Sequence, residues 1–432
     1  MQLDRLADTA LDACVKGVPM AAAPLRLGDV GKRGWNLLKG DLPLPAAVIK
    51  RTALDHNSAW MRRFLDLTDA KIAPHGKTTM APQLFAKQLA DGAWGITVAS
   101  VNQMKVCRAF GVDRIVLANQ LIGRQEIAAV LDELRADPRF DFYCLVDSPE
   151  GVQRLSEAAR AKSIGRPLQV LLEGGFPGGR TGCRTVDAAI GVARAVKSAA
   201  PHLSLRGVEG FEGLLTSGPP AEQDAQVAGF LDFLVEIARR CAAEKLFGDG
   251  PVILTAGGSA FFDLAAQRLH NTVGSQGVQV VIRSGCYLTH DSKSYRDFVA
   301  RLMERMPQAK SLGDGLKPAL EVWAYVQSRP EPGRAIATMG KRDVGWDMSM
   351  PLLEQWYRPG THQAPQAAGP LGTVVALNDQ HAHIELPASS PFQVGDLLSF
   401  GVSHPCTTFD RWQLIYEVDD AYNVTGAIKT FF

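Results

Sequence analysis

The chain has 432 residues, of which 46% are hydrophobic and 21% are charged, so it can bury a large core and is not a disordered protein. This length corresponds to two or three ordinary domains, or to an α/β barrel of about 250 residues with a second domain. The 46 lysines and arginines nearly balance the 45 aspartates and glutamates, for a net charge of +1. Overall charge therefore gives no reason to expect a nucleic-acid partner or an anionic membrane.

The first residues and the cysteines indicate a reducing compartment. Asp4, Asp8 and Asp12 interrupt the apolar stretch that a secretory signal would need, and no run approaches the roughly 18 apolar residues of a membrane-spanning helix. The seven cysteines are odd in number, widely scattered and without a Cys-x-x-Cys pair. We therefore expect thiols rather than disulfides, and a cytoplasmic protein with no membrane partner.

Between about residues 45 and 300, short apolar runs alternate with longer helical patterns. The runs are nearly all apolar, as expected for strands that are covered on both faces. Strands alternating with helices predict a parallel (β/α)8 TIM-type barrel, which we place at residues 40–305. The runs are KIAP (71–74), GITV (95–98), RIVLA (114–118), FYCLV (142–146), LQVLLE (168–173), LSLRGVEG (203–210), VILTAG (252–257) and VQVVIR (278–283).

After about residue 310 the helical periodicity fades. Segments such as ALEVWAYVQSR, GTVVALNDQHAHIELP and DLLSFGVSHP are strand-like, and several are separated by glycine and proline. We therefore predict a mostly antiparallel β domain over residues 310–432. We expect residues 1–39 to pack with this β domain.

Lys77 follows the first predicted barrel strand, in the sequence KIAPHGKTT. Catalytic side chains of such barrels cluster at the carboxyl ends of the strands, so an amine at this position is well placed for chemistry. A lysine used as a nucleophile forms a Schiff base with a carbonyl group. A solvated charge in a loop is the alternative interpretation.

Glycine-rich turns follow the seventh and eighth predicted strands. TAGGSAFF contains Gly257, Gly258 and Ser259, and RSGCYLTHD contains Gly285 and Cys286. Glycines allow backbone N–H groups to approach an anion, and barrels often bind phosphate after strands seven and eight. A lysine at one strand end and a phosphate site at two others together indicate pyridoxal phosphate (PLP).

A second candidate site is the pair His404 and Cys406, after the predicted strand DLLSFGV. In an extended segment, side chains two residues apart lie on one face and could bind one metal ion. A pair without function is the alternative. His381 and His383 would also share a face if residues 381–386 form a strand; packed or hydrogen-bonded side chains are favoured there over a further metal ligand.

Taken together, these pieces resemble the fold-type III PLP enzymes, whose barrels are similar to that of alanine racemase. Within them the chain is most similar to the branch of D-serine dehydratase and D-threonine aldolase. The resemblance covers about residues 40–410. The motifs that carry it are PHGKT around Lys77, GAWGITVAS (92–100), RTG (180–182), TAGGS (255–259), SGCYLTHD (284–291) and SHPC (403–406).

The resemblance implies a role for several residues in binding PLP. Lys77 would hold the cofactor, Arg180 would approach its phenolic oxygen and Arg283 would lie against its pyridine nitrogen. An arginine solvated beyond the strand end is the alternative for Arg283. His75 would orient the cofactor or stabilise a turn. The phosphate would be bound by Gly257, Gly258, Ser259, Gly285 and Cys286.

The resemblance also implies Zn²⁺ at His404 and Cys406, where the aldolases have a histidine and an acid; an imidazole with a thiolate suits zinc. The chain departs from the family at several positions. Ala73 and Thr79 replace a usual arginine and histidine, and Phe211 replaces a tyrosine common in the branch. Substrate contacts therefore cannot be transferred directly from relatives.

The activity implied by the resemblance is that of a PLP-dependent lyase, a D-serine dehydratase that eliminates water and ammonia from a D-β-hydroxy amino acid. Lys77 would remove the α-proton, and the metal would polarise the β-hydroxyl. A D-threonine aldolase, which breaks the Cα–Cβ bond, is the first alternative, and a PLP-binding protein without catalysis is the second. The resemblance further implies a homodimer.

Overall fold

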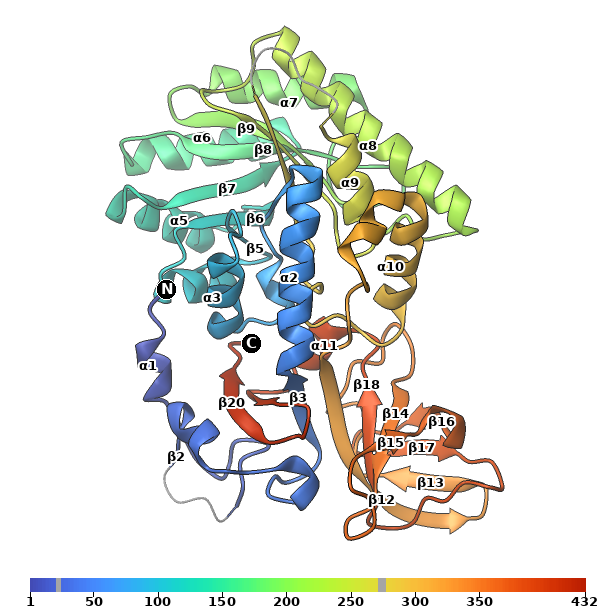
Figure 1. Ribbon diagram of the computed structural model, residues 1–432. Coiled ribbons are helices and arrows are strands. Elements are labelled where there is room, and N and C mark those ends of the chain that lie inside the picture. The colour runs from blue at the N-terminus through green and yellow to red at the C-terminus, as the bar shows by residue number, and fades with distance from the viewer. Residues whose placement is uncertain (21–24, 271–276) are drawn as a thin grey trace. The chain divides into compact units, whose positions relative to one another are not determined.

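The computed structural model describes residues 1–20, 25–270 and 277–432, which form two compact units (Figure 1). Unit 1 contains Met1–Met61, Thr78–Lys87 and Cys286–Phe432, and unit 2 contains Arg62–Lys77 and Gln88–Gly285. The range that we predicted for the barrel, 40–305, therefore contributes residues at both of its ends to unit 1.

Unit 2 is built around a parallel sheet of eight strands in the order β4, β11, β10, β9, β8, β7, β6, β5. A bridge between His75 and Thr97 joins the two ends of this order and closes the sheet. Each predicted apolar run overlaps one of the strands, with ends that differ by at most two residues, which confirms the (β/α)8 barrel. The strands are β4 (Lys71–Ile72), β5 (Ile96–Val98), β6 (Arg114–Gln120), β7 (Asp141–Val146), β8 (Leu168–Gly174), β9 (Leu203–Gly210), β10 (Val252–Ala256) and β11 (Val278–Ile282).

Side chains fill the interior of the barrel. A buried cluster joins residues of six strands or of the segments next to them: Ala73, Val116, Tyr143, Leu145, Leu171, Ile253 and Val281. Each fully buried aliphatic side chain of this size contributes about 1.5–3 kcal/mol to folding. The barrel is therefore a packed core, and open space for a ligand is left to the strand ends.

Helices cover the outside of this barrel. Ser100, Ser148 and Thr185 begin three of them by accepting a hydrogen bond from a backbone N–H of the first turn. The helices within unit 2 are α4 (Val101–Ala109), α5 (Arg124–Ala136), α6 (Pro149–Lys162), α7 (Val186–Ser198), α8 (Pro220–Ala243) and α9 (Phe262–Arg268).

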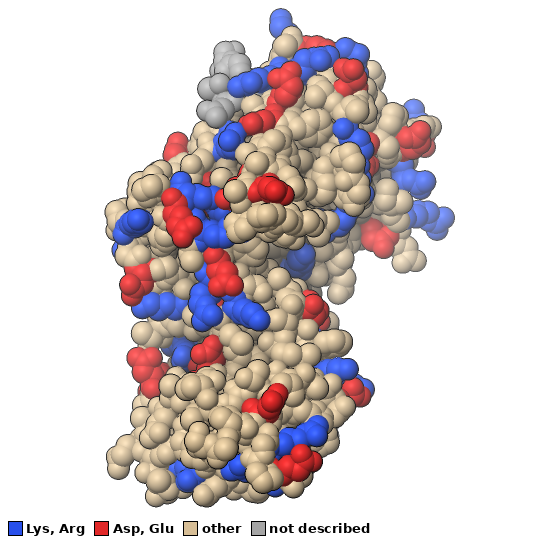
Figure 2. Space-filling view, turned by 90° about the vertical axis from the view of Figure 1, so that its right-hand side faces the viewer, with Lys and Arg blue, Asp and Glu red and all other residues tan. Residues whose placement is uncertain are grey.

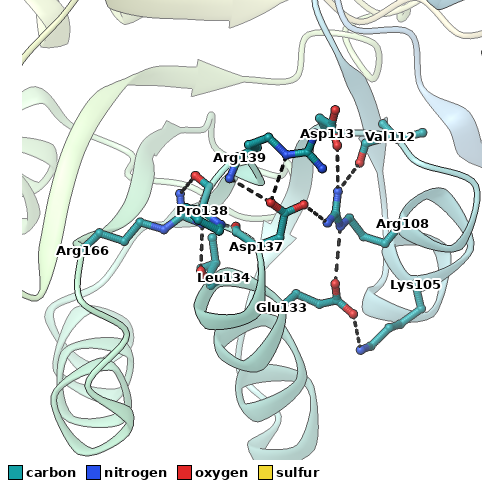
Figure 3. A network of polar contacts seen from close by, with 10 residues as sticks. All are labelled: Lys105, Arg108, Val112, Asp113, Glu133, Leu134, Asp137, Pro138, Arg139 and Arg166. Carbon is teal, nitrogen blue, oxygen red and sulfur yellow. Dashed lines mark hydrogen bonds and ion pairs between the residues drawn. The ribbon is translucent and has the colours of Figure 1, made fainter. Parts of the chain in front are cut away.

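Arg108 ties α4 to α5 at the amino-terminal side of the barrel (Figure 3). Its guanidinium donates to Asp137 at 2.8 Å, to the carbonyl of Val112 at 2.9 Å and to Glu133 at 3.4 Å. Arg166 donates to the carbonyls of Leu134, Asp137 and Pro138, which the end of α5 leaves without helical partners. Because catalytic groups of such barrels lie at the opposite strand ends, we interpret this network as structural.

Unit 1 contains a sheet in the order β15, β14, β18, β12, β13, β17, β16, to which β3, β19 and β20 add. All of its pairings are antiparallel except that of β3 with β19, which confirms the predicted β domain. The strands are β3 (Ala46–Lys50), β12 (Leu320–Glu331), β13 (Arg334–Ala337), β14 (Leu352–Tyr357), β15 (Gln366–Ala367), β16 (Thr373–Leu377), β17 (Ala382–Glu385), β18 (Leu397–Gly401), β19 (Leu414–Val418) and β20 (Val424–Lys429).

Strand β3 explains why the first residues of the range predicted for the barrel belong to unit 1. It is a buried apolar strand like those of the barrel, but it hydrogen-bonds to β12 and β19. Residues 35–37 also hydrogen-bond to residues 422–424, close to β20. Strand β3 near the amino terminus thus shares a sheet with strands near the carboxyl terminus. Sequence periodicity is a local signal, so it cannot detect pairing between segments so far apart in the sequence.

The surface agrees with the balanced composition. Acidic and basic side chains are interspersed over the face shown in Figure 2. Within the described ranges, no helix combines the length and the apolar character needed to cross a membrane.

Candidate active site

Lys77 lines a cavity of unit 2 at the carboxyl ends of the barrel strands. It lies in a short 3-10 turn, Gly76–Thr78, that follows β4. Four of the residues predicted from the sequence, Lys77, Arg180, Gly258 and Arg283, meet in this cavity. The other lining residues are His75, Ala99, Ala118, Asn119, Glu173, Glu209 and Phe211.

Arg283 is buried, with only 5% of its side chain exposed, so the alternative of a solvated arginine is wrong. Its guanidinium donates to the hydroxyl of Thr255 at 2.8 Å and to the carbonyl of Gly210 at 3.0 Å, and it forms an ion pair with Glu209. Burial raises the pKa of Glu209 to about 7, although Arg283 opposes this shift. The contact of Arg283 with a pyridine nitrogen stays a prediction.

Arg180 lies over the ring of Phe211, with its Cζ 4.5 Å from the ring centroid. A phenylalanine at this position thus keeps the aromatic face that can attract a cation, without a hydroxyl. The loop that carries Arg180 is held by Glu173, which accepts hydrogen bonds from Thr181 Oγ1 at 2.7 Å and from Gln120. The sequence analysis missed both cavity acids, Glu173 and Glu209, although each is a charge near the carboxyl end of a barrel strand.

His75 is half-buried, and its buried Nδ1 atom has no hydrogen-bond partner within the described part of the chain. Burial and the nearby cations of Lys77, Arg283 and Arg180 lower its pKa well below the usual value, so the ring is neutral. Glu209 Oε2 likewise has no partner among the described residues. Buried polar atoms normally have partners, so these two atoms beside three cationic side chains fit a bound, anionic cofactor such as PLP.

The turn after β10 differs from the prediction in one respect. The N–H groups of Gly257 and Gly258, which we expected to bind phosphate, donate to the carboxylate of Glu212 at 3.1 and 2.7 Å. Glu212 is fully buried, and Gly257 has a φ of +83°, which favours glycine. A carboxylate of the chain thus takes the bonds expected for the phosphate. Ser259, whose hydroxyl lies 3.3 Å from that of Ser284, stays a predicted phosphate residue, as do Gly285 and Cys286.

His404 and Cys406 belong to unit 1, and they do not lie in an extended segment as expected. His404 directly precedes a short helix, α11 (Pro405–Phe409), in which Cys406 is the second residue. Proline is favoured at the first position of a helix, because its φ is already helical and its missing N–H has no helical acceptor there. Pro405 therefore turns the chain between the two candidate ligands.

Asp347 orients His404. The Asp347 carboxylate accepts hydrogen bonds from His404 Nδ1 and from Thr407 Oγ1, both at 2.6 Å. Burial alone would raise the pKa of Asp347, but the bonds from Thr407 and His404 lower it, so Asp347 is ionised and can only accept. Metal-binding histidines commonly donate one ring N–H to a carboxylate and bind the ion through the other nitrogen. The donor chemistry at His404 therefore fits a metal.

The sulfur of Cys406 donates to Thr78 Oγ1 at 3.3 Å and lies 3.5 Å from the sulfur of Cys286. Groups of three or more His, Cys, Asp and Glu side chains that could hold a metal ion are absent from residues 1–20, 25–270 and 277–432. Any metal held by His404 and Cys406 would thus depend on these two protein ligands, as the sequence analysis expected, with water or substrate in the remaining positions.

The two candidate histidines of the β domain differ in their surroundings. His383, in β17, accepts a hydrogen bond from Arg334 at Nδ1 and donates to Asn378 Oδ1 through Nε2, both at 2.6 Å, which agrees with the hydrogen-bonded interpretation. His381 is exposed just before that strand, so it is not packed as expected.

The barrel gathers a lysine, two arginines and a glycine turn at its strand ends, and the chain has a separate β domain. These features together are typical of a class of PLP-binding enzyme. The chain belongs to the family described as "Alanine racemase, N-terminal domain", which matches residues 49–264. A second model, "Putative serine dehydratase domain", matches residues 319–418. Together they make the chain a member of the fold-type III PLP enzymes, as the sequence motifs indicated.

Two curated relatives are similar over much of the chain. A D-threonine aldolase from Arthrobacter sp is 24% identical over 375 residues, which cover 85% of this chain and 86% of the relative. A D-threo-3-hydroxyaspartate dehydratase from Delftia sp. (strain HT23) is 30% identical over 257 residues, which cover 58% of this chain and 62% of the relative.

The solved structures show the same fold. A D-threonine aldolase from Filomicrobium marinum has a TM-score of 0.72 at 21% identity, over 94% of this chain and 98% of that one. A variant of a D-threo-3-hydroxyaspartate dehydratase, with a cysteine replaced by alanine and in the metal-free form, has a TM-score of 0.69 at 20% identity, over 92% and 99%.

Proposed function

We propose that the chain is a PLP-dependent lyase that eliminates water and ammonia from a D-configured β-hydroxy amino acid such as D-serine. The observation that carries this proposal is the cavity in which Lys77, Arg180 and Arg283 come together at the carboxyl ends of the barrel strands. Membership of the fold-type III enzymes supports PLP as the cofactor. The names of the two relatives support β-hydroxy D-amino acids as the class of substrate.

In this proposal Lys77 would hold the cofactor, and its amine, once free, would remove the α-proton of the substrate. When bound, PLP supplies the electron sink that stabilises the negative charge left at Cα. Arg180 would bind on the phenolic-oxygen side of the cofactor. Arg283, already paired with Glu209, would face the pyridine nitrogen and keep it unprotonated.

His404 and Cys406 are the proposed ligands of Zn²⁺, which would act as a Lewis acid at the β-hydroxyl. The Asp347–His404 hydrogen bond supports this assignment. A second support is that a related dehydratase, solved in a metal-free form, is a variant in which alanine replaces a cysteine. Asp347 would keep the imidazole oriented.

A retro-aldol cleavage of D-threonine-like substrates is the second candidate, because the Arthrobacter aldolase is similar over 85% of the chain. Cys406 favours elimination over retro-aldol cleavage, because the aldolases have an acid where this chain has the cysteine. A hard carboxylate would suit Mn²⁺ or Mg²⁺ better than Zn²⁺.

The purified protein should be incubated with PLP and Zn²⁺ and then with D-serine, D-threonine or D-threo-3-hydroxyaspartate, with the L-isomers as controls. Ammonia and a 2-oxo acid from a D-isomer alone, lost on chelation and restored by Zn²⁺, would support the dehydratase. Glycine with an aldehyde and no ammonia would decide for the aldolase. Full occupancy by PLP without any product would instead indicate a binding protein.

We also propose a homodimer, from the resemblance alone. Light scattering on the PLP-loaded protein would test it, and a mass of one chain would contradict it.

A further inference from the structure

Two cysteines from distant parts of the sequence lie next to each other in unit 1. The sulfurs of Cys286 and Cys406 are 3.5 Å apart, although 120 positions separate the residues. The hydroxyl of Thr78 lies beside both sulfurs, 3.3 Å from that of Cys406 and 3.9 Å from that of Cys286. A disulfide bond measures about 2.05 Å, so the two sulfurs would need to approach each other by about 1.5 Å to form one.

The two thiols differ in access to solvent. Cys286 is 2% exposed, whereas Cys406 is partly exposed. Oxidants attack accessible thiols first, and a buried neighbour then resolves the oxidised sulfur into a disulfide. The geometry therefore gives Cys406 the role of the attacked cysteine and Cys286 that of the resolving one.

Four other cysteines are unsuited to this chemistry. Burial raises the pKa of Cys107, Cys144 and Cys241 to about 12 and that of Cys183 to about 11, so these groups are protonated at neutral pH. The thiolate is the reactive form, so all four are inert toward mild oxidants. Cys14, by contrast, is exposed, and it offers a control for unselective oxidation.

We propose that Cys286 and Cys406 are a redox modification site, at which hydrogen peroxide forms a reversible disulfide within one chain. The sulfur of Cys406 attacks an oxygen of the peroxide; an S–O bond forms, the O–O bond breaks, and the released hydroxide leaves as water with the thiol proton. The sulfur of Cys286 then attacks that of Cys406; the S–S bond forms, the S–O bond breaks, and a second water leaves with the proton of Cys286. Two electrons pass from the sulfurs to the peroxide, and a dithiol reverses the reaction.

The consequence of this modification rests on the proposed function. Cys406 is the proposed thiolate ligand of Zn²⁺, and a sulfur in a disulfide is no longer a thiolate. Cys286 follows the glycine turn predicted to bind phosphate. Oxidation would therefore remove the metal ligand and restrain that turn at once, so that metal binding and disulfide formation exclude each other.

The test uses the full chain, stripped of metal and treated with hydrogen peroxide. Remaining thiols are counted after denaturation, and unreduced peptides are mapped by mass spectrometry. We expect the loss of two of the seven thiols, a cross-linked peptide pair containing residues 286 and 406 with the mass of two hydrogens missing, and full recovery with dithiothreitol. Intact thiols at both positions, or Cys406 oxidised to an acid without a cross-link to Cys286, would overturn the proposal.

Two variants make the result specific. Cys286→Ser should give no cross-link and should leave Cys406 as a sulfenic acid that dimedone traps, whereas Cys14→Ser should keep the cross-link unchanged. A cross-link of Cys406 to a different cysteine in the wild type would also overturn the proposal. Loading with Zn²⁺ before the oxidant separates this inference from the proposed function: an unprotected Cys406 would refute zinc binding there, while the disulfide itself would stand.

Discussion

The carboxylate of Asp347 and the Nδ1 atom of His404 are joined by a hydrogen bond of 2.6 Å, across 57 positions of the sequence. A second bond of 2.6 Å, from Thr407 Oγ1, fixes the other oxygen of the same carboxylate. This arrangement sets the tautomer of the imidazole, because an ionised carboxylate can only accept. It also connects the loop around residue 347 to the helix that carries Cys406.

Replacing this carboxylate should therefore weaken metal binding. For Asp347→Ala we expect the affinity for Zn²⁺ to fall about 10–100-fold, the usual effect of losing a partner that orients a ligand. Isothermal titration with Zn²⁺ on the metal-free protein measures this without any assay of activity. Asp379→Ala removes an exposed carboxylate of the same unit and should bind zinc like the wild type. If both variants bind Zn²⁺ with equal affinity, Asp347 does not orient a metal ligand.

Lys77 should be needed for both the colour and the activity of the protein. For Lys77→Ala we expect loss of the visible absorbance of protein-bound PLP and a fall in turnover of at least about 10²–10⁴-fold, the usual contribution of a general base. Lys71→Ala, which removes an exposed lysine six positions earlier, should retain both. Turnover retained by the Lys77 variant would reject Lys77 as the base of the lyase.

Much of this fold could be predicted because each barrel strand is a short, buried, apolar run between turns. Strand β3 has the same local pattern, and only its pairing with β12, some 270 positions away, assigns it to the other sheet. The sequence also allowed Lys77, Arg180 and Arg283 to be placed at strand ends. It could not predict the partner of His404, since nothing local to Asp347 distinguishes it from a solvated acid.

For other features that differ from the prediction, the sequence does contain an indication. Pro405 between the two candidate ligands favours the start of a helix over an extended segment. Glu209 lies near the end of the buried strand LSLRGVEG, and Glu212 follows that strand two residues later. A buried charge needs a partner, so both residues could have been singled out. The structure supplies these partners: Arg283 for Glu209, and two backbone N–H groups for Glu212.

Glu212 should stabilise the turn after β10. In Glu212→Gln one carboxylate oxygen becomes an NH2 group, which cannot accept the N–H of Gly257 or Gly258. An unsatisfied buried group costs about 1–3 kcal/mol, so the free energy of unfolding should fall by that amount, and the affinity for PLP should fall with it. Urea denaturation and PLP titration measure the two effects, with the exposed Glu150→Gln as a control. An unchanged free energy of unfolding would show that Glu212 does not stabilise the turn.

Glu209 should make stability depend on pH. Its pKa rises from 4.5 to about 7 on folding, so between these values the folded state binds more protons than the unfolded state. The free energy of unfolding contributed by this group therefore decreases as the pH rises from about 4.5 to about 7, and it is constant above that range. The change is on the order of 3 kcal/mol.

The comparison of wild type with Glu209→Gln isolates this contribution from those of other groups. The neutral amide of the variant resembles the protonated acid, so the variant keeps at neutral pH the stability that the wild type loses when Glu209 ionises. Because the amide does not titrate, the unfolding free energy of the wild type should rise relative to that of the variant, by on the order of 3 kcal/mol, as the pH is lowered from 7 to 4.5. Urea denaturation of the PLP-free, metal-free proteins across this range measures it, and the exposed Glu236→Gln should follow the wild type. A difference that stays constant with pH would mean that Glu209 remains ionised throughout, held by Arg283.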